Sequence, residues 1–186
     1  MALLMDREVR GICWLAVALA IGGVSGAGTQ GQTVDEYQVK AAFLYNFAKF
    51  VEWPAQAFRD RSTPFTICVL GQNPFGPALE AAIDGKVVED RKLVVRQFAD
   101  VRQVSGCHIL FVSSSERKLL RSILGEIKES GVLTVGETDG FTVEGGVVNL
   151  LVEGGRVRFE INLDAAGQQK LRISSKLLSL ARIVKK

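Results

Sequence analysis

Strand-like and helix-like segments alternate along most of this chain, and this alternation constrains its fold more than any other feature. Short runs rich in β-branched residues and bounded by turn residues predict strands at residues 65–70, 92–98, 108–113 and 132–136. Helices are predicted at residues 35–52, 75–83 and 116–129. Continuous apolar strands separated by helices are typical of a mainly parallel sheet that is covered by helices on both faces.

The C-terminal part of the sequence departs from this alternation. Two strand-like runs, "GGVVNLLV" and "RVRFEINL", flank the turn "EGG", which indicates an antiparallel hairpin. The run "KLLSLARIV" is expected to form a last amphipathic helix. The sequence therefore predicts an α/β fold, a Rossmann-like three-layer sandwich with a mainly parallel sheet and a C-terminal antiparallel hairpin.

Residues 1–27 are predicted to be a cleaved secretory signal peptide. Arg7 and Arg10 precede the uncharged apolar run "GICWLAVALAIGGV", which leads into the small residues "SGAG". A membrane anchor is the alternative, but an anchor needs about 20 continuous apolar residues and this run is shorter. Cleavage is expected after Ala27, with Ala20 as the second candidate. Residues 28–186 would then form a single exported domain.

The formal net charge of +3 does not describe a surface suited to nucleic acid. Part of it comes from Arg7 and Arg10 in the predicted signal peptide and from Lys185 and Lys186 at the C-terminus. A nucleic-acid-binding role is therefore not expected.

Two cysteines remain in the predicted mature chain, Cys68 within "FTICVLG" and Cys107 at the start of "CHILFVS". In an oxidising compartment an isolated pair is more often a disulfide than two free thiols, and both cysteines lie in predicted strands. On the chain-entropy model such a bridge would add about 4 kcal/mol to stability. A redox-active pair is the alternative, but redox-active cysteines are usually close in sequence, and these are far apart.

Groups for catalysis or metal binding are scarce. The only histidine, His108, follows Cys107 directly, and neighbouring residues of a strand point to opposite faces, so the two cannot form a nucleophile and base pair. One histidine and a paired set of cysteines offer few metal ligands. The segment "FVSSSER" has the spacing of a helix-capping box, with an anion-binding loop as the alternative use. We expect no catalytic activity, no metal and no cofactor.

The first predicted helix has a core face and an opposite face that is a candidate for binding. Its core face is expected to contain the apolar residues Val39, Phe43, Leu44, Phe47, Phe50 and Val51. On the opposite face Ala41 and Ala48 flank Tyr45, which would allow another backbone to approach closely, and tyrosine is enriched at interfaces. This face is therefore a candidate partner-binding surface, and a solvated face is the alternative.

The predicted hairpin offers a second candidate surface. In "RVRFEINL" the residues Val157, Phe159, Ile161 and Leu163 are expected to face the core, which leaves Arg158, Glu160 and Asn162 on the other face. A solvated outer face explains this pattern. If a helix covers part of it, these three residues would line a polar groove with Arg172 or Lys176, suited to a partner loop or a small anionic ligand.

Several segments in a fixed order resemble the YfiR-like family of periplasmic proteins. They are "VKAAFLYNFAKFVEWP", "FTICVLGQNPFG", "CHILFVSSSE", "VLTVGE", "GFTVEGGVVNLLVEGGRVRFEINLDAAG" and "LRISSKLLSLARIV". The resemblance implies a homodimeric periplasmic repressor of an inner-membrane diguanylate cyclase, which lowers cyclic di-GMP and biofilm formation and is relieved by an outer-membrane lipoprotein. It also implies a bridge between Cys68 and Cys107. The segment "ETDGFTVEGGVVNLL" departs from the best-known type of member, because it has no cysteine for a second bridge.

Two classes of function remain open from the sequence. The leading class is a periplasmic protein that binds and represses a membrane-bound cyclase. The other class is a periplasmic small-ligand binding component that serves a membrane sensor or transporter. An exported α/β domain fits both classes, and a fold alone does not separate them.

Overall fold

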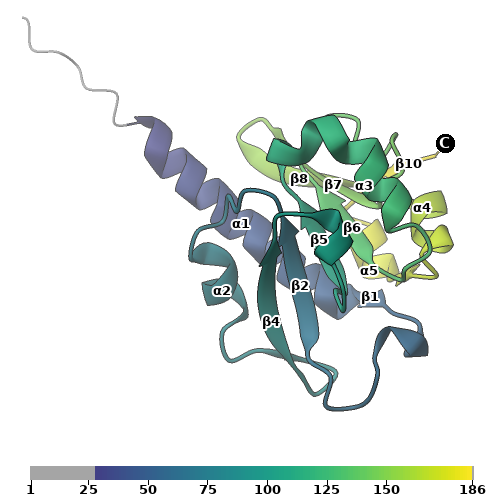
Figure 1. Cartoon of the computed structure of the whole chain (residues 1–186). Coiled ribbons are helices and arrows are strands. Elements are labelled where there is room, and N and C mark those ends of the chain that lie inside the picture. The colour runs from purple at the N-terminus through teal and green to yellow at the C-terminus, as the bar shows by residue number, and fades with distance from the viewer. Residues whose placement is uncertain (1–27, 186) are drawn as a thin grey trace, which may run out of the picture.

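A mixed eight-stranded sheet forms the centre of the molecule in the computed structural model, which describes residues 28–185 (Figure 1). The helices are α1 (Gly28–Phe50), α2 (Ala78–Ile83), α3 (Leu120–Glu126), α4 (Leu163–Gln168) and α5 (Ser175–Leu178). The strands are β1 (Val51–Glu52), β2 (Phe65–Leu70), β3 (Val87–Val88), β4 (Arg91–Phe98), β5 (Ile109–Val112), β6 (Leu133–Gly136), β7 (Val148–Glu153), β8 (Arg156–Asn162), β9 (Arg172–Ile173) and β10 (Arg182–Val184). The predicted signal peptide lies outside the described residues.

The strand order in the large sheet is β10-β8-β7-β6-β5-β2-β4-β3. From β4 through β2, β5 and β6 to β7, neighbouring strands run parallel. β7 and β8 form the predicted antiparallel hairpin, and β3 pairs with β4 antiparallel at the far edge. The strands β1 and β9 make a separate two-stranded sheet. The predicted α/β fold with a C-terminal hairpin is therefore confirmed.

Helices cover both faces of the sheet, as the continuous apolar strands require. Every residue of β2 is buried, because both faces of this central strand are covered. One core cluster joins α1, α2, α4 and α5 to the sheet, and its aromatic centre includes Phe47 and Phe159, with ring centroids 5.4 Å apart. A second cluster lies under α3 and contains Phe141. Figure 1 shows α1 behind the sheet and α3 in front of it.

The C-terminal run "KLLSLARIV" does not form one helix, so this part of the prediction is wrong. Ser174 caps the short helix α5, which ends at Leu178, and the chain then forms β10 parallel to β8. The β-branched residues Ile183 and Val184 suit a strand, and the edge of β8 offers a hydrogen-bonding partner. Tertiary pairing therefore overrides the helical pattern.

The helix predicted at residues 116–129 is also modified. A 3-10 segment, Ser114–Leu119, comes first and α3 follows it. Ser113 caps the 3-10 segment, because its hydroxyl accepts a hydrogen bond from the N–H of Ser115. Across residues 28–185, none of the helices combines the length and the apolar character that crossing a bilayer demands.

Candidate functional site

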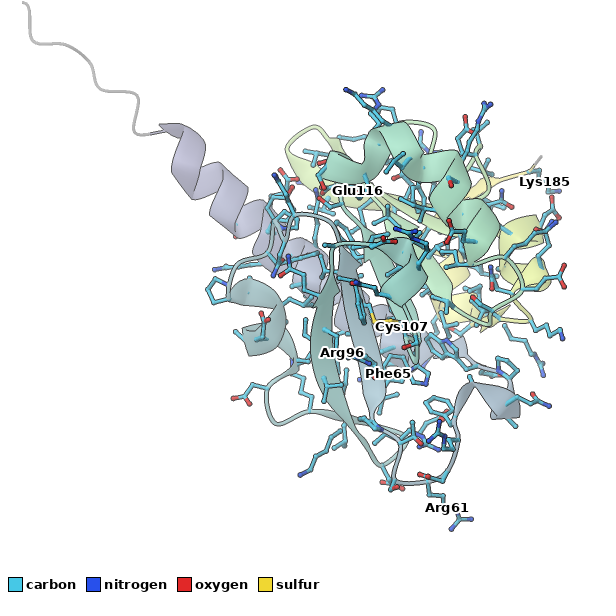
Figure 2. The ribbon with its side chains drawn as sticks, viewed as in Figure 1. Arg61, Phe65, Arg96, Cys107, Glu116 and Lys185 are labelled. Carbon is cyan, nitrogen blue, oxygen red and sulfur yellow. A yellow bond between two sulfur atoms is a disulfide. The ribbon has the colours of Figure 1, made fainter. Side chains whose placement is uncertain are left out.

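Cys68 and Cys107 form a disulfide, with their Cα atoms 5.9 Å apart. Cys68 lies in β2, and Cys107 lies two residues before β5, which pairs with β2. Figure 2 shows the bridge beside the labelled Cys107 in the middle of the molecule. Both cysteines belong to the core cluster under α3. The predicted bridge between neighbouring strands is confirmed, and its burial indicates a structural role.

His108 is a packed core residue. Its Nδ1 accepts a hydrogen bond from the N–H of Thr66 (3.0 Å), so its proton lies on Nε2, which donates to the carbonyl of Ala57 (3.1 Å). The ring contacts Phe58 and Phe65, with centroid distances of 4.3 and 4.9 Å. Burial lowers the pKa of His108. The neutral ring thus joins the loop after β1 to the start of two central strands.

The face predicted on α1 is not available to a partner through its alanines. Ala41 is fully buried and Ala48 is 1% exposed, and both belong to the core cluster that includes Leu79 and Ile83 of α2. The prediction is wrong for these two residues because α1 packs against α2 as well as against the sheet. Tyr45 is half-buried, and the ammonium group of Lys86 lies 4.3 Å from the centre of its ring.

The loop at residues 137–147 covers part of the polar face of the hairpin, at Glu160 and Asn162. Asn162 is 2% exposed; its amide donates to the carbonyl of Thr142 (2.8 Å) and accepts from the N–H of Ala165. It therefore caps α4 and does not face a partner, which corrects its predicted role. Glu160 is partly buried and accepts a hydrogen bond from the Thr142 hydroxyl (2.6 Å). Arg158 is exposed, as predicted.

The cation beside Glu160 comes from a different element than the sequence predicted. Arg172 belongs to β9 and faces Glu52 of β1, with 3.6 Å between Nε and the carboxylate. The Nε of Arg182 in β10 lies 3.5 Å from the Glu160 carboxylate instead. The unpredicted strand β10 therefore completes this polar surface.

A cleft of about 620 Å³ lies where β5 and β6 end, and Glu160 and Arg182 are part of it. The carboxyl ends of parallel strands are the usual place for ligands in open α/β sheets. We call this site the acidic cleft. Its lining comprises Glu36, Tyr37, Lys40, Ser114, Glu137, Asp139, Gly140, Asn149, Leu150, Leu151, Val152, Glu153, Glu160 and Arg182.

Acidic side chains outnumber basic ones in the acidic cleft by five to two. The buried ammonium group of Lys40 lies 2.5 Å from Glu36 and 2.7 Å from Glu137. Tyr37 donates its hydroxyl to Glu137 (3.2 Å), and burial together with the negative charge of Glu137 raises the pKa of this hydroxyl. The contacts with Lys40 and Tyr37 fix the Glu137 carboxylate at the end of β6.

The second cation of the acidic cleft, Arg182, also faces two carboxylates. Its guanidinium lies 2.7 Å from Glu153, in addition to its contact with Glu160. Because each cation is shared between two acids, and because Asp139 adds a further carboxylate, the cleft keeps an excess of three negative charges. The site therefore favours a positively charged occupant.

Asn149 is the unusual residue of the acidic cleft. Its side chain is fully buried, and neither its oxygen nor its nitrogen has a hydrogen-bond partner. Strand register places it in a row with Gly136 of β6, Glu160 of β8 and Arg182 of β10. Buried side-chain amides are normally hydrogen-bonded, so the unpaired amide distinguishes Asn149 from the other polar residues of the cleft.

Sequence reasoning identified Glu160 but missed Lys40, Glu137, Asn149 and Arg182. These four residues come from α1, the end of β6, β7 and β10, and only the tertiary structure brings them together. One signal was present in the sequence. Glu137 follows a predicted buried parallel strand directly, and polar residues at that position often line a ligand site.

Neither the disulfide nor His108 makes a reactive centre, and no group of three or more His, Cys, Asp or Glu side chains in residues 28–185 could hold a metal ion. The fold and the cleft define an α/β domain with an acidic cleft on its surface. The chain belongs to the YfiR/HmsC-like family, whose model matches residues 37–182. This family is periplasmic and regulatory. No curated protein matches the chain.

Solved structures are similar to this chain at low sequence identity. The chain is similar to the ABC domain from Streptococcus pneumoniae in complex with L-Trp, with a TM-score of 0.50 and 10% identity over 82% of this chain and 60% of that one. It is also similar to a conserved domain protein from Vibrio cholerae, with a TM-score of 0.48 and 13% identity over 65% of this chain and 54% of that one. This chain thus spans only part of the length of both proteins.

Proposed function

We propose that this protein represses an inner-membrane diguanylate cyclase by binding the cyclase's periplasmic region, and so lowers cyclic di-GMP and biofilm formation. The observation that carries the proposal is the family match over residues 37–182. The polar cleft supports it, because this site has charged and hydrogen-bonding groups for recognition but no nucleophile, base and metal set for catalysis.

Deletion of the gene tests this proposal. We expect cyclic di-GMP to rise and biofilm to thicken, and the full chain supplied in trans should restore the lower level. A version without residues 1–27 should fail to complement, because the proposal places the protein in the periplasm after removal of these residues. Unchanged cyclic di-GMP in a strain that normally expresses the protein would refute the proposal. A small-ligand binding component would then be the better reading.

The partner-binding surface is proposed to include Arg158 and Glu160. Arg158 is exposed on the hairpin and Glu160 lines the acidic cleft, so both are placed to contact a partner. Arg158→Ala should weaken repression while the thermal stability stays unchanged, since exposed substitutions usually alter stability by less than about 0.5 kcal/mol. Phe159→Ala is the contrasting variant. This residue is 3% exposed, so its truncation should unfold or loosen the hairpin as well as weaken repression.

A homodimer and relief by an outer-membrane lipoprotein belong to the same proposal. Of Ala41, Tyr45 and Ala48, only Tyr45 has a partly exposed side chain that could contact a second copy. If Tyr45 contacts a second copy, Tyr45→Glu should reduce the mass of the folded protein in light scattering to that of a monomer, because an unpaired charge in a desolvated contact is costly. Equal masses for the two proteins would remove this helix from the interface.

A further inference from the structure

We propose that the acidic cleft binds an extended basic segment of a partner protein, which adds to the free edge of β7 and places a lysine or arginine side chain among the carboxylates. The proposal rests on the proposed function, because the segment would belong to the regulated membrane protein. Three observations carry it: an unpaired strand edge, the unpaired amide of Asn149, and the excess negative charge of the cleft.

The first observation is the strand edge. β7 pairs with β8 along its whole length, from Val148 to Glu153, but it pairs with β6 only at Val148 and Asn149. β6 ends at Gly136, and the chain then turns away. The cleft therefore has the second half of β7 as one wall, and this half has no neighbouring strand on the β6 side.

The alternation of hydrogen-bonded residue pairs along the hairpin shows which backbone groups of β7 are free at this edge. The N–H of Asn162 donates to the carbonyl of Val147 (2.9 Å), so this pair bonds across the hairpin. Hydrogen-bonded pairs alternate in an antiparallel ladder, so Val152 directs its N–H and C=O away from β8. An unpaired edge of this kind is a template for an added strand, and main-chain hydrogen bonds then supply much of the affinity.

The second observation is the amide of Asn149. A carboxamide offers donors and an acceptor side by side, so it can pair with the N–H and the C=O of one residue in an extended chain, because these two groups point the same way. Because both groups of Asn149 lack a partner and are buried, an occupant that supplies both would satisfy an otherwise unpaired amide. A peptide backbone has these complementary groups at every residue.

The third observation is the charge. Lys40 and Arg182 are each already shared between two acids, and Asp139 adds another carboxylate, so a third cation would find carboxylates to pair with. Charge-assisted hydrogen bonds to ammonium or guanidinium groups are among the stronger polar interactions in proteins. The carboxylates of residues 28–185 are not grouped as a metal site, which favours an organic cation.

Binding of synthetic peptides to the purified mature protein tests the inference. The probe is a short fluorescent peptide of alternating lysine and threonine, measured by fluorescence anisotropy. Two matched peptides serve as controls, one with glutamate in place of lysine and one with N-methyl groups on alternate backbone nitrogens. We expect the basic peptide alone to bind, and its affinity to fall as salt is raised. Equal binding of the acidic or the N-methylated peptide, or no binding of the basic one, would overturn the proposal.

Variants of the protein identify the site. Asn149→Leu should weaken binding of the basic peptide about tenfold, the effect of losing two hydrogen bonds of ordinary strength. Asp139→Asn should weaken binding about threefold and reduce the salt dependence, since a partly exposed ion pair contributes modestly. Glu80→Gln removes an exposed carboxylate of α2 outside the cleft and should leave binding unchanged. Unaltered affinity in both cleft variants would refute the assignment.

The peptide assay and the deletion experiment test the two proposals independently, so a negative result in one does not decide the other. If deletion raises cyclic di-GMP but the basic peptide does not bind, the proposed repression stands and the peptide site is wrong. If the peptide binds as expected but deletion leaves cyclic di-GMP unchanged, the cleft is a peptide site and the repressor function is wrong.

Discussion

Replacing Asn149 with leucine should make the folded protein more stable. The side chain of Asn149 is fully buried with both polar atoms unpaired, and leucine has the same branched shape without polar atoms. Burying an unpaired polar group costs about 1–3 kcal/mol on mutational scales. Removing it should therefore raise the free energy of unfolding by about 2 kcal/mol, which for a domain of this length raises the melting temperature by about 4–8 °C.

Asn162 provides the matched control, because it is a buried asparagine on the neighbouring strand whose amide nitrogen and oxygen are both hydrogen-bonded. Asn162→Leu removes the cap of α4, which costs about 1 kcal/mol. It also leaves the carbonyl of Thr142 without its donor, which costs about 1–3 kcal/mol more. We therefore expect opposite shifts from the same substitution at two positions of one sheet.

Thermal and urea unfolding of the two variants, followed by circular dichroism, measures this difference. Leucine methyl groups are larger than the atoms they replace, so Asn149→Ala is a second variant that avoids overpacking. If both Asn149 variants lose as much stability as Asn162→Leu, the amide of Asn149 has strong partners in the folded protein and the reasoning is wrong. A more stable but non-binding variant would show that the cleft sacrifices stability for recognition.

Three further predictions follow from the rest of the fold. Cys68→Ser should lower the free energy of unfolding by about 2–5 kcal/mol, and thiol alkylation of both cysteines in native, unreduced protein would contradict the bridge. Burial lowers the pKa of His108 in the folded protein. The stability that the neutral ring contributes should therefore be complete above about pH 6.5, the ordinary histidine pKa. It should decrease as the pH falls from there toward the lowered pKa of the folded state. Urea unfolding at pH 7 and pH 5.5 measures this loss, and His108→Phe should reduce it. Gly136→Ala should lower the free energy of unfolding by about 1–3 kcal/mol, because the added methyl group would collide with the Phe141 ring. Gly125→Ala in α3 is the control and should not destabilise the protein, because no atom lies within 4 Å of the added methyl group.

The sheet was predictable from sequence because its central strands are continuous apolar runs with clear boundaries. The prediction for residues 65–70 coincides with β2, and the hairpin turn lies at Gly154 and Gly155, which both have positive φ. The strand β10 at the C-terminus was not predictable, because it forms by pairing with the edge of β8. Periodicity cannot show which distant segment will supply a pairing partner.

The binding faces were harder to predict than the fold. A helical wheel separated α1 into a core face and an outer face, but it could not show that α2 would cover Ala41 and Ala48. Val39, assigned to the core, is 40% exposed and lines a hollow beside Val152 and Val157 of the hairpin. The acidic cleft depends on long-range register and on residues from separate elements, which a single sequence does not encode as a local pattern.

The short strand β10 also protects the molecule from self-assembly. It is only three residues long and carries the charged residue Arg182. A short strand and a charged side chain both discourage another molecule from pairing with a sheet edge. β10 covers Glu160–Asn162 of β8, so without it the free edge would extend over all seven residues of β8, whose sequence "RVRFEIN" combines β-branched and aromatic residues. Proteolytic loss of the residues from Arg182 onward should therefore cause the domain to aggregate through intermolecular strand pairing.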